Sequence, residues 1–352
     1  MKFRIEELAI PETVTDDWTE MVRVRNDIEA LAVGNRDLAI EPDELLPHWL
    51  NPSEPKRLLV ARVDGHIVAR GIYEVSLEDF DTTAWLSVEV LDTYRRSGIG
   101  AALYDGLVLW ARADGKTVLQ AYVPQKASDT DDVIPSPTGF GSVPRDSDST
   151  RFLLERGFVL GQVERMSRLD LPVDPGLLAR LLSEATDAAG PDYRIISWSG
   201  STPDAHLADL ALLRTRMGTD APSGALDADL SVYTAERVRE EDRLLESSPR
   251  VRLTVLAQHI PTGEVAGFSE LSVPPELHRP VSQEDTIVLT EHRGHRLGML
   301  LKVANIAHLE RERPGHPAIT TFNAEENRFM LSVNEAVGFV AWGYEGGWRK
   351  EL

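Results

Sequence analysis

The sequence predicts an α/β protein of two tandem domains, each with a mixed, mainly antiparallel sheet flanked by helices. Two observations support this fold class. Runs typical of strands alternate with runs typical of helices, and some neighbouring strands are joined by tight glycine turns, as in a mixed sheet covered by helices. The chain has 352 residues, which corresponds to two domains at the usual size of roughly 150 residues each.

A repeat within the chain strengthens the two-domain prediction. Three pairs of residues lie 198 positions apart, as 293 − 95 shows for the first: Arg95 with Arg293, Gly65 with Gly263, and Gly100 with Gly298. A Gly-Phe pair follows in each half, at 157–158 and 338–339. Chance pairing of glycines is disfavoured because the strand, turn and helix contexts also agree. The sequence therefore indicates a duplicated domain.

The expected domain boundaries follow from breaks between the two halves. Leu171-Pro-Val-Asp-Pro175 begins the connection, and Ala189-Gly-Pro-Asp192 interrupts the chain again. Proline and glycine clusters of this kind mark turns and connections. We expect an N-terminal domain at 1–172, a linker helix within 173–191 and a C-terminal domain at 192–352.

In the first half, alternating residues predict a strand over 2–8. Thr15 is a suitable cap for a helix that runs to Val33 with an acidic first turn. The turn Asp64-Gly65 predicts a hairpin of strands 57–63 and 67–75. The remaining expected elements are strands at 85–91, 116–123 and 158–169 and helices at 98–113 and 149–155.

The second half repeats this order after a linking helix at 176–188. Its first strand is expected at 193–198, and helices follow at 203–216 and 234–246. Gly263 predicts the second hairpin, between strands 251–259 and 264–273. The remaining expected elements are strands at 286–289, 318–323 and 342–349 and helices at 297–313 and 327–337.

Residues 124–148 form a long insertion that is rich in Pro, Gly, Ser and Asp and has no apolar period. Loops of this length are either functional or disordered. Two interpretations therefore stand for this segment: an active-site or interface loop, and plain disorder.

Composition excludes several classes of protein. The chain has no cysteine, so disulfides, thiolate metal ligands and thiol nucleophiles are all excluded. Its net charge of −20 opposes nucleic-acid binding and favours cationic small molecules or basic peptides, although acidity also serves solubility alone. The first residues contain no apolar signal core, and no apolar run reaches about 18 residues. We therefore expect a cytoplasmic protein with no membrane partner.

The segment from Val90 to Gly100 reads VLDTYRRSGIG and contains the pattern Arg-x-x-Gly-x-Gly between an expected strand and an expected helix. The unpaired N–H groups of a helix N-terminus, with Arg95 and Arg96 beside them, attract a pyrophosphate. The spacing differs from the dinucleotide fingerprint Gly-x-Gly-x-x-Gly, and no P-loop Gly-Lys-Ser/Thr is present. The motif therefore predicts an anchor for another pyrophosphate compound.

This motif resembles the acyl-CoA pyrophosphate loop of the GNAT family of N-acetyltransferases. The resemblance implies two GNAT-like domains, acetyl-CoA as cosubstrate and direct attack of an amine on the thioester in a ternary complex. It also implies that backbone of the preceding strand contacts the pantetheine arm. In the N-terminal half the implied cofactor-binding residues are Val88, Val90, Arg95, Arg96, Ser97, Gly98, Ile99 and Gly100.

The second copy, HRGHRLG at 292–298, departs from the pattern because Arg296 stands where the first copy has Gly98. A Cβ at this position is expected to crowd the phosphate. Arg293, His295 and Arg296 are donors that compensate in part, and the variant resembles one in actinobacterial tandem GNAT proteins. The implied cofactor-binding residues of this half are Val288, Arg293, Gly294, His295, Arg296, Leu297, Gly298 and Asn327.

The resemblance places a tyrosine acid shortly after the Gly-Phe pair, where it protonates the leaving thiolate. Residues 157–166 contain no tyrosine, so the N-terminal half has an anchor but lacks an acid, and Glu89 is a weak candidate for its base. In the C-terminal half Tyr344 matches the acid, with an ordinary strand aromatic as the alternative. Asp285, and less strongly Glu284, are candidate bases, and either could instead close a turn.

Asn327 matches the family asparagine that bonds the pantetheine arm, and a helix N-cap is a compatible role for it. His292 and His295 lack a third ligand nearby, so we predict no metal site. We expect the acceptor pocket in residues 30–55 and 217–250. Because two fused copies can mimic a dimer, both a monomer and a homodimer are open.

Three functions are compatible with these residues. The first is an N-acetyltransferase that acts on a primary amine of a small molecule or peptide, with chemistry in the C-terminal half. The second is an acetyltransferase like mycothiol synthase, which Arg296 disfavours because that enzyme has a complete glycine-rich loop in its C-terminal half. The third is a non-catalytic module that binds acyl-CoA or a partner protein. Substitution of Tyr344 by phenylalanine separates the first from the third.

Overall fold

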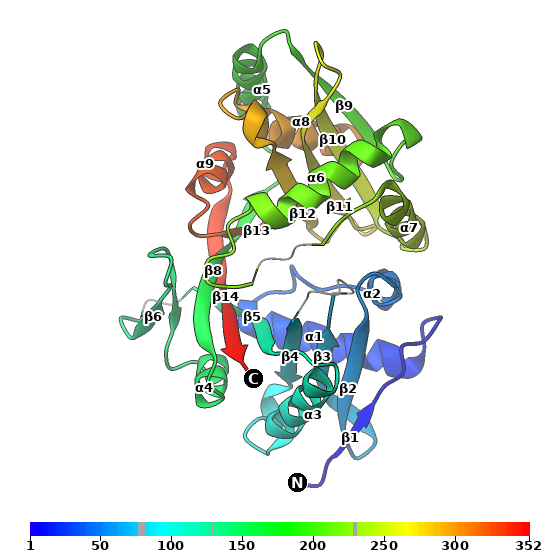
Figure 1. Cartoon of the computed structure of the whole chain (residues 1–352), viewed down its shortest axis with the longest axis vertical. Helices are drawn as coiled ribbons and strands as arrows, with labels where there is room; N and C mark the ends of the chain where they lie inside the picture. Colours follow the sequence, from blue (N-terminus) through cyan, green and yellow to red (C-terminus); the bar gives the residue numbers. More distant parts are fainter. Residues whose placement is uncertain (77–81, 128–129, 228–230) are drawn as a thin grey trace. The chain divides into compact units, whose positions relative to one another are not determined.

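The computed structural model of the chain describes residues 1–76, 82–127, 130–227 and 231–352, which form two compact units (Figure 1). The first unit holds Met1–Glu164, Ser223–Asp227 and Gly343–Leu352. The second holds Arg165–Pro222 and Ala228–Trp342. Both units combine strands and helices, which confirms the predicted fold class.

The sheet of the first unit has the strand order β1-β2-β3-β4-β5-β14, followed by the first part of β8. From β1 to β14 in this order, neighbouring strands run antiparallel except β4 and β5, which are parallel. The bounds are β1 Arg4–Glu7, β2 Lys56–Val63, β3 His66–Glu74, β4 Thr83–Val90, β5 Val118–Lys126, β8 Val159–Asp170 and β14 Val340–Glu351. The hairpin turn Asp64-Gly65 lies where it was predicted, and both residues have positive φ.

Helices cover both faces of this sheet. The bounds are α1 Asp16–Val33, α2 Pro42–Trp49, α3 Ile99–Ala113 and α4 Asp148–Glu155. Strand β2 is buried on both sides: Leu58 and Val60 pack with Trp18 of α1, whereas the alternate residues Leu59 and Ala61 join the core around α3. Because successive side chains of a strand point to opposite faces, this explains the continuous apolar run of β2.

The last strand, β14, completes the sheet of the first unit. It pairs antiparallel with β5 from Gly343 opposite Lys126 to Glu351 opposite Val118. Trp348 is fully buried in the core that α3 covers. We expected this strand in the C-terminal domain. Periodicity identifies a strand but does not identify its partner, and residues 343–352 in fact belong to the first unit.

The second unit has the strand order β13-β12-β11-β10-β9. Helices α5, α8 and α9 share one core with the sheet, and α6 and α7 share another. The bounds are α5 Pro175–Ala189, β9 Tyr193–Ser199, α6 Leu207–Asp220, α7 Ala235–Glu246, β10 Val251–His259, β11 Val265–Val273, β12 Val281–Val288, α8 Leu297–Glu312, β13 Ala318–Ala324 and α9 Arg328–Val337. The predicted linker helix is α5, and it packs on α8 within this unit.

The segment 124–148 is structured over most of its described part. It begins inside β5, and β6 Val133–Pro135 pairs antiparallel with β7 Ser142–Pro144. Val143 is fully buried in the core that α3 covers. Plain disorder is therefore wrong for 130–148, while residues 128–129 of the segment lie outside the described residues, as do 228–230 of the expected acceptor region. Among described helices, none has the length and apolarity needed to span a membrane.

Candidate acyl-CoA sites

The loop between β4 and α3 forms a concave array of backbone donors. After a short 3-10 turn at Asp92–Tyr94, Arg96 and Gly98 both have positive φ, of 59° and 90°. The first intrahelical hydrogen bond of α3 runs from the Ala102 N–H to the Gly98 carbonyl. The N–H groups just before Ala102 therefore have no acceptor within the helix, as at every helix start. Alternating left-handed residues at a helix N-terminus form a typical anion site.

Arg95 fixes this loop to the end of β4. Its Nε donates to the Val90 carbonyl at 3.2 Å, and its guanidinium lies 3.4 Å from Asp92. Ser97 donates its hydroxyl to the Tyr94 carbonyl. Arg96 is exposed beside the helix start. Arg95 thus holds the loop in shape, whereas Arg96 is the guanidinium available to a phosphate.

The second unit repeats this loop before α8. A 3-10 turn at Thr290–His292 precedes it, and the Nε of Arg293 donates to the Val288 carbonyl at 3.1 Å. Gly294 and Arg296 are the left-handed residues here, with φ of 88° and 53°. Arg296 thus adopts the conformation that Gly98 adopts in the first unit. Its side chain is exposed, and its guanidinium lies 3.8 Å from Glu184 of α5.

In each unit the strand before the loop and the parallel strand that follows the next helix pair only at their beginnings. The ladder between β4 and β5 covers Thr83–Trp85 with Val118–Gln120, and that between β12 and β13 covers Val281 and Ser282. Beyond these residues the paired strands leave backbone groups without a partner on the facing strand. Val88 and Val90 lie in the part of β4 that pairs with β3 but not with β5, and Val288 lies in the part of β12 that pairs with β11 but not with β13. Such a gap gives an extended ligand arm access to strand backbone.

Tyr344 lies in the first unit, and its prediction as a residue of the C-terminal domain is wrong. It is opposite Gln125 in the ladder between β14 and β5. Its half-buried ring packs against the same core as Val88 and Val90 of β4. The N-terminal half of the sequence lacks a candidate acid of its own, and the far end of the chain brings one into the first unit.

Glu284 and Asp285 form a bulge in β12. The register between β11 and β12 shifts here, so both residues face Glu270 alone. Both side chains are exposed, yet the protein around them limits their solvation and raises the pKa of each carboxyl. For Asp285 the charge of Glu270 acts in the same direction. They remain candidate bases. They belong to the second unit, whereas Tyr344 belongs to the first.

Glu270 is itself the centre of a buried ion-pair network in the second unit. Arg214 of α6 donates to it at 3.1 Å, and Thr254 donates to it at 3.0 Å. Burial opposes ionisation of Glu270, but the charges of Arg214 and Arg252 outweigh burial and lower its pKa. A permanent negative charge therefore lies beneath the bulge.

Asn327 caps α9: its Oδ1 accepts from the Met330 N–H at 3.2 Å. The expected capping role is thus confirmed, and a contact with the pantetheine arm stays a prediction.

Glu89 is already engaged, because Arg70 donates to both of its carboxylate oxygens at 2.7 and 2.8 Å. Although burial acts against the charge, Arg70 lowers the pKa of Glu89. A salt-bridged carboxylate of this kind is a poor proton acceptor.

A group of carboxyls in the first unit was not predicted from the sequence. Burial, with the nearby charges of Glu164 and Glu29, raises the pKa of Glu345 to about 8. Burial likewise raises the pKa of Glu29 to about 7, against the charge of Arg25. These residues come from α1, β8 and β14, so no local pattern connects them. This group could have been predicted only with the knowledge that β14 pairs with the sheet of the first unit.

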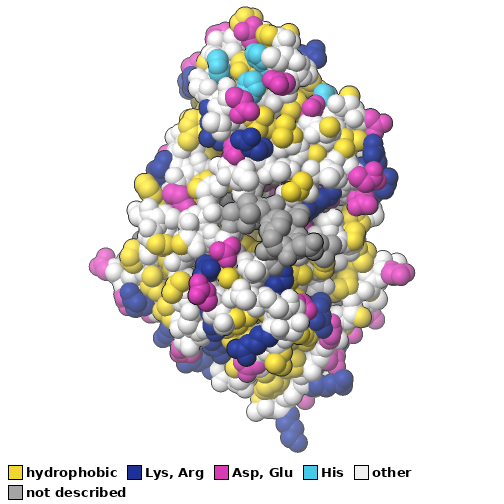
Figure 2. Space-filling view, viewed as in Figure 1, with side chains coloured by type: hydrophobic (Ala, Val, Ile, Leu, Met, Phe, Trp, Pro, Cys, Tyr) yellow, Lys and Arg dark blue, Asp and Glu magenta, His cyan; other side chains and the backbone are white. Residues whose placement is uncertain are grey.

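Aromatic rings gather beside the loop of the second unit. Tyr193 lies next to His259, His292 and His295, with ring centroids 5.2 to 5.8 Å apart. The Tyr193 hydroxyl and the His292 Nδ1 are 3.0 Å apart. No cluster of potential metal ligands occurs within the described ranges. Figure 2 shows acidic and basic side chains interspersed on one face, without an extended basic area in its described part.

Comparisons with known proteins support this geometry. Residues 21–129 match the model of the acetyltransferase (GNAT) family. No curated protein matches the chain in a sequence search. The structure is similar to a tandem GNAT protein from the clavulanic acid biosynthesis pathway, at 24% identity and a TM-score of 0.75, over 99% of this chain and 98% of that one.

Two other solved structures have the same fold. A GCN5-related N-acetyltransferase from Sphaerobacter thermophilus is 15% identical, with a TM-score of 0.62 over 99% of this chain and 95% of that one. An acetyltransferase from Pyrococcus horikoshii is 13% identical, with a TM-score of 0.56 over 99% and 89%. Residues 21–129 thus match the acetyltransferase (GNAT) family model, and the chain has, over nearly its whole length, the fold of a tandem GNAT protein.

Proposed function

We propose that the protein is an acyl-CoA-dependent N-acyltransferase that transfers acetyl from acetyl-CoA to a primary amine of a small molecule or peptide. The observation that carries the proposal is the donor array at the start of α3, where Arg96 and Gly98 are left-handed and the helix N–H groups are unpaired. This array suits the pyrophosphate of coenzyme A. The match of 21–129 to the acetyltransferase family supports the same conclusion.

We place the chemistry in the first unit. Its anchor loop, the part of β4 that has no partner on β5, and Tyr344 all belong to this unit. Val88, Val90 and Tyr344 pack against one core, which supports Tyr344 as the group that meets the sulfur. In the second unit Asp285 and Glu284 stay candidate bases, but Tyr344 belongs to the first unit, as does β14 from Gly343 onward.

The proposed reaction joins the amine nitrogen to the thioester carbonyl carbon and breaks the carbon–sulfur bond. The ammonium first loses one proton to a base and then attacks as the neutral amine. Tyr344 gives its hydroxyl proton to the departing thiolate, and its phenolate takes the second proton from the nitrogen as the amide forms. Glu345 is the proposed base. It follows Tyr344 on β14, so the two side chains point to opposite faces of the sheet, and the proposal requires the thioester to lie in the gap between β4 and β5, where both faces are accessible. Its pKa of about 8 suits proton transfer near neutral pH.

Calorimetric titration with acetyl-CoA tests the proposal. Substitution of Gly98 by tryptophan should abolish binding to the first unit, because the side chain would stand at the donor array. Gly65→Trp is a matched control: Gly65 also has positive φ and open space around its Cβ position, but it lies in the hairpin turn. Both variants carry the same left-handed strain.

Turnover is measured on the same variants by thiol release from acetyl-CoA, with a panel of small primary amines and lysine-containing peptides. We expect activity with at least one amine in the wild type and in Gly65→Trp, and none in Gly98→Trp. Binding without turnover of any amine would favour a non-catalytic module. Turnover that survives Gly98→Trp would move the chemistry to the second unit.

A further inference from the structure

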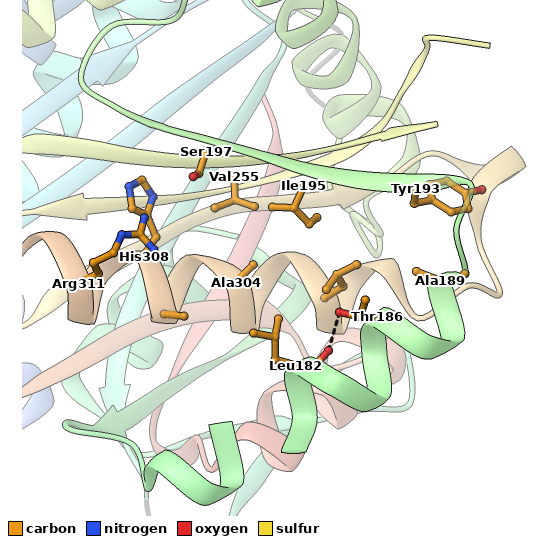
Figure 3. A pocket seen from close by; sticks show the side chains of 13 residues that line it. Leu182, Thr186, Ala189, Tyr193, Ile195, Ser197, Val255, Ala304, His308 and Arg311 are labelled. Atoms are coloured by element: carbon orange, nitrogen blue, oxygen red, sulfur yellow. Dashed lines mark hydrogen bonds between the residues drawn. The ribbon is translucent and has the colours of Figure 1, made fainter. Parts of the chain in front are cut away.

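The second unit contains a groove between α5, the edge strand β9 and α8 (Figure 3). Its volume is about 400 Å³. Aliphatic side chains line most of it, among them Leu182 of α5, Ile195 of β9 and Leu300 of α8. Small residues, Ala304 and Ala307, leave the space open on the α8 side. The groove therefore offers a mainly apolar surface between α5, β9, β10 and α8.

One end of the groove is polar. His308 and Arg311 of α8 lie side by side there, near Ser197, while Tyr193 and Ala189 mark the opposite end (Figure 3). His308 is only 4% exposed, and its Nδ1 is buried without a hydrogen-bond partner. Its Nε2 lies 3.5 Å from the Ser199 hydroxyl. A buried polar atom without a partner costs free energy unless a ligand or water satisfies it.

Arg311 provides a cationic group at this end. Its side chain is 60% exposed, and its Nε lies 3.2 Å from a carboxylate oxygen of Glu312. Burial, followed by the charge of Arg311, lowers the pKa of His308, and the Nδ1 of His308 is closed to solvent. The guanidinium beside an aliphatic channel matches a carboxylate that carries an aliphatic chain.

We propose that this groove binds an aliphatic monocarboxylate of medium chain length, with the carboxylate at Arg311 and the chain along Ile195 and Leu300. The volume lies within the range of roughly 300 to 1,000 Å³ that is usual for small-molecule sites. The lining residues include none of the residues 293–298 that form the anchor loop. Tyr193 lines the groove and also packs against His295 of that loop, so the groove is adjacent to the anchor loop of the second unit. The proposal stands independently of the proposed activity.

Decanoate is the probe, titrated calorimetrically into the full chain with and without excess acetyl-CoA. We expect saturable binding to one site in both conditions. Ala304→Trp should abolish it, because the indole would fill the channel. Ser197→Trp is a second blocking variant at an exposed rim position, and thermal unfolding of both variants checks that they fold.

The head group is tested with Arg311→Gln and with decanol. Arg311→Gln removes a charge-assisted contact and should weaken decanoate binding about tenfold. Arg313 is a neighbouring exposed arginine outside the groove, so Arg313→Gln should leave decanoate binding unchanged. No saturable binding, or binding that survives both tryptophan variants, would overturn the site. Equal affinity for decanol and decanoate would overturn the recognition of a carboxylate.

Discussion

Gly98 and Arg296 occupy equivalent positions in the two units: each is the N-cap of the helix that follows the anchor loop, and each is left-handed, with φ of 90° and 53°. Two positions earlier the residue types are exchanged, because Arg96 and Gly294 are the left-handed residues there. Each loop thus uses one glycine and one arginine for the same pair of conformations. The replacement in the second copy leaves the backbone shape intact.

Substitution of Arg296 by glycine separates backbone strain from charge. An arginine with positive φ strains the folded backbone by about 1 kcal/mol. A glycine at this position lowers stability by a similar amount, because it loses more conformational entropy on folding. We therefore expect the free energy of unfolding in urea to change by less than about 0.5 kcal/mol. Acetyl-CoA affinity of the second unit should fall several-fold, because one guanidinium near the phosphates is lost. Tighter binding by Arg296→Gly would mean that the arginine obstructs the site.

Tyr344→Phe removes only the hydroxyl from the proposed acid. We expect kcat to fall by about two to four orders of magnitude, the usual contribution of general acid catalysis, with no change in acetyl-CoA affinity. Tyr193→Phe is the control in the second unit, since Tyr193 lies beside that unit's anchor loop. If Tyr193→Phe loses turnover and Tyr344→Phe keeps it, the assignment of chemistry to the first unit is wrong.

Lys302 of α8 lowers the free energy of unfolding of the second unit near neutral pH, compared with an uncharged side chain at this position. Its side chain is 1% exposed and lies 5.2 Å from the centre of the Phe339 ring. Burial lowers the pKa of its ammonium to about 7. Below pH 7 both the folded and unfolded states carry the proton, and the folded state carries the full cost of burying it, at roughly 1.4 kcal/mol per pKa unit.

The Lys302→Met variant should therefore be more stable than the wild type at pH 6.5, by about 2 kcal/mol or more. Between pH 7 and 10.5 the unfolded lysine keeps its proton while the folded one loses it, so the wild type gains stability and the difference shrinks. Urea unfolding at pH 6.5, 8 and 9.5 measures this trend. A difference that stays constant with pH would show that packing, not charge, is responsible.

Glu345→Gln tests the raised pKa of Glu345, whose effect on stability has the opposite pH dependence to that of Lys302. From pH 4.5 to 8 the folded carboxyl keeps its proton while the unfolded one loses it, so the wild type loses stability across this interval. The variant should match the wild type at pH 4.5 and exceed it progressively up to pH 8. Substitution of the exposed Glu155 by glutamine provides the baseline. Turnover of Glu345→Gln should fall as well if Glu345 accepts the ammonium proton.

Local sequence signals predicted most of the elements but not their distribution between the units. The capping residue Thr15, the turn glycines Gly65 and Gly263 and the motif before α3 act over a few residues, and the structure has each feature where it was expected. Helix α2 was not predicted, because Pro47 interrupts its pattern although Pro42 and the reciprocal cap of Glu41 and Glu44 favour its start.

The candidate site was harder to predict from the sequence, for a physical reason. Both anchor loops are contiguous motifs and could be recognised directly. Tyr344 and Glu345 lie where β14 pairs, and that pairing depends on the burial of Trp348 and on the ladder to β5 more than 200 positions away in the chain. His308 could not be singled out from the sequence either, because its Nδ1 lacks a hydrogen-bond partner as a result of the residues packed around α8 and not of the sequence of α8.

The position of β14 also has a consequence for biosynthesis. The core formed by Leu103 and Leu107 of α3 is closed by Trp348, so a ribosome must deliver almost the entire chain before the first unit can reach its native state. Contacts of such high sequence separation slow folding. Until they form, β5 presents an open edge, and an exposed edge invites pairing with other chains. Nascent chains that stall before residue 343 should therefore depend on chaperones for solubility.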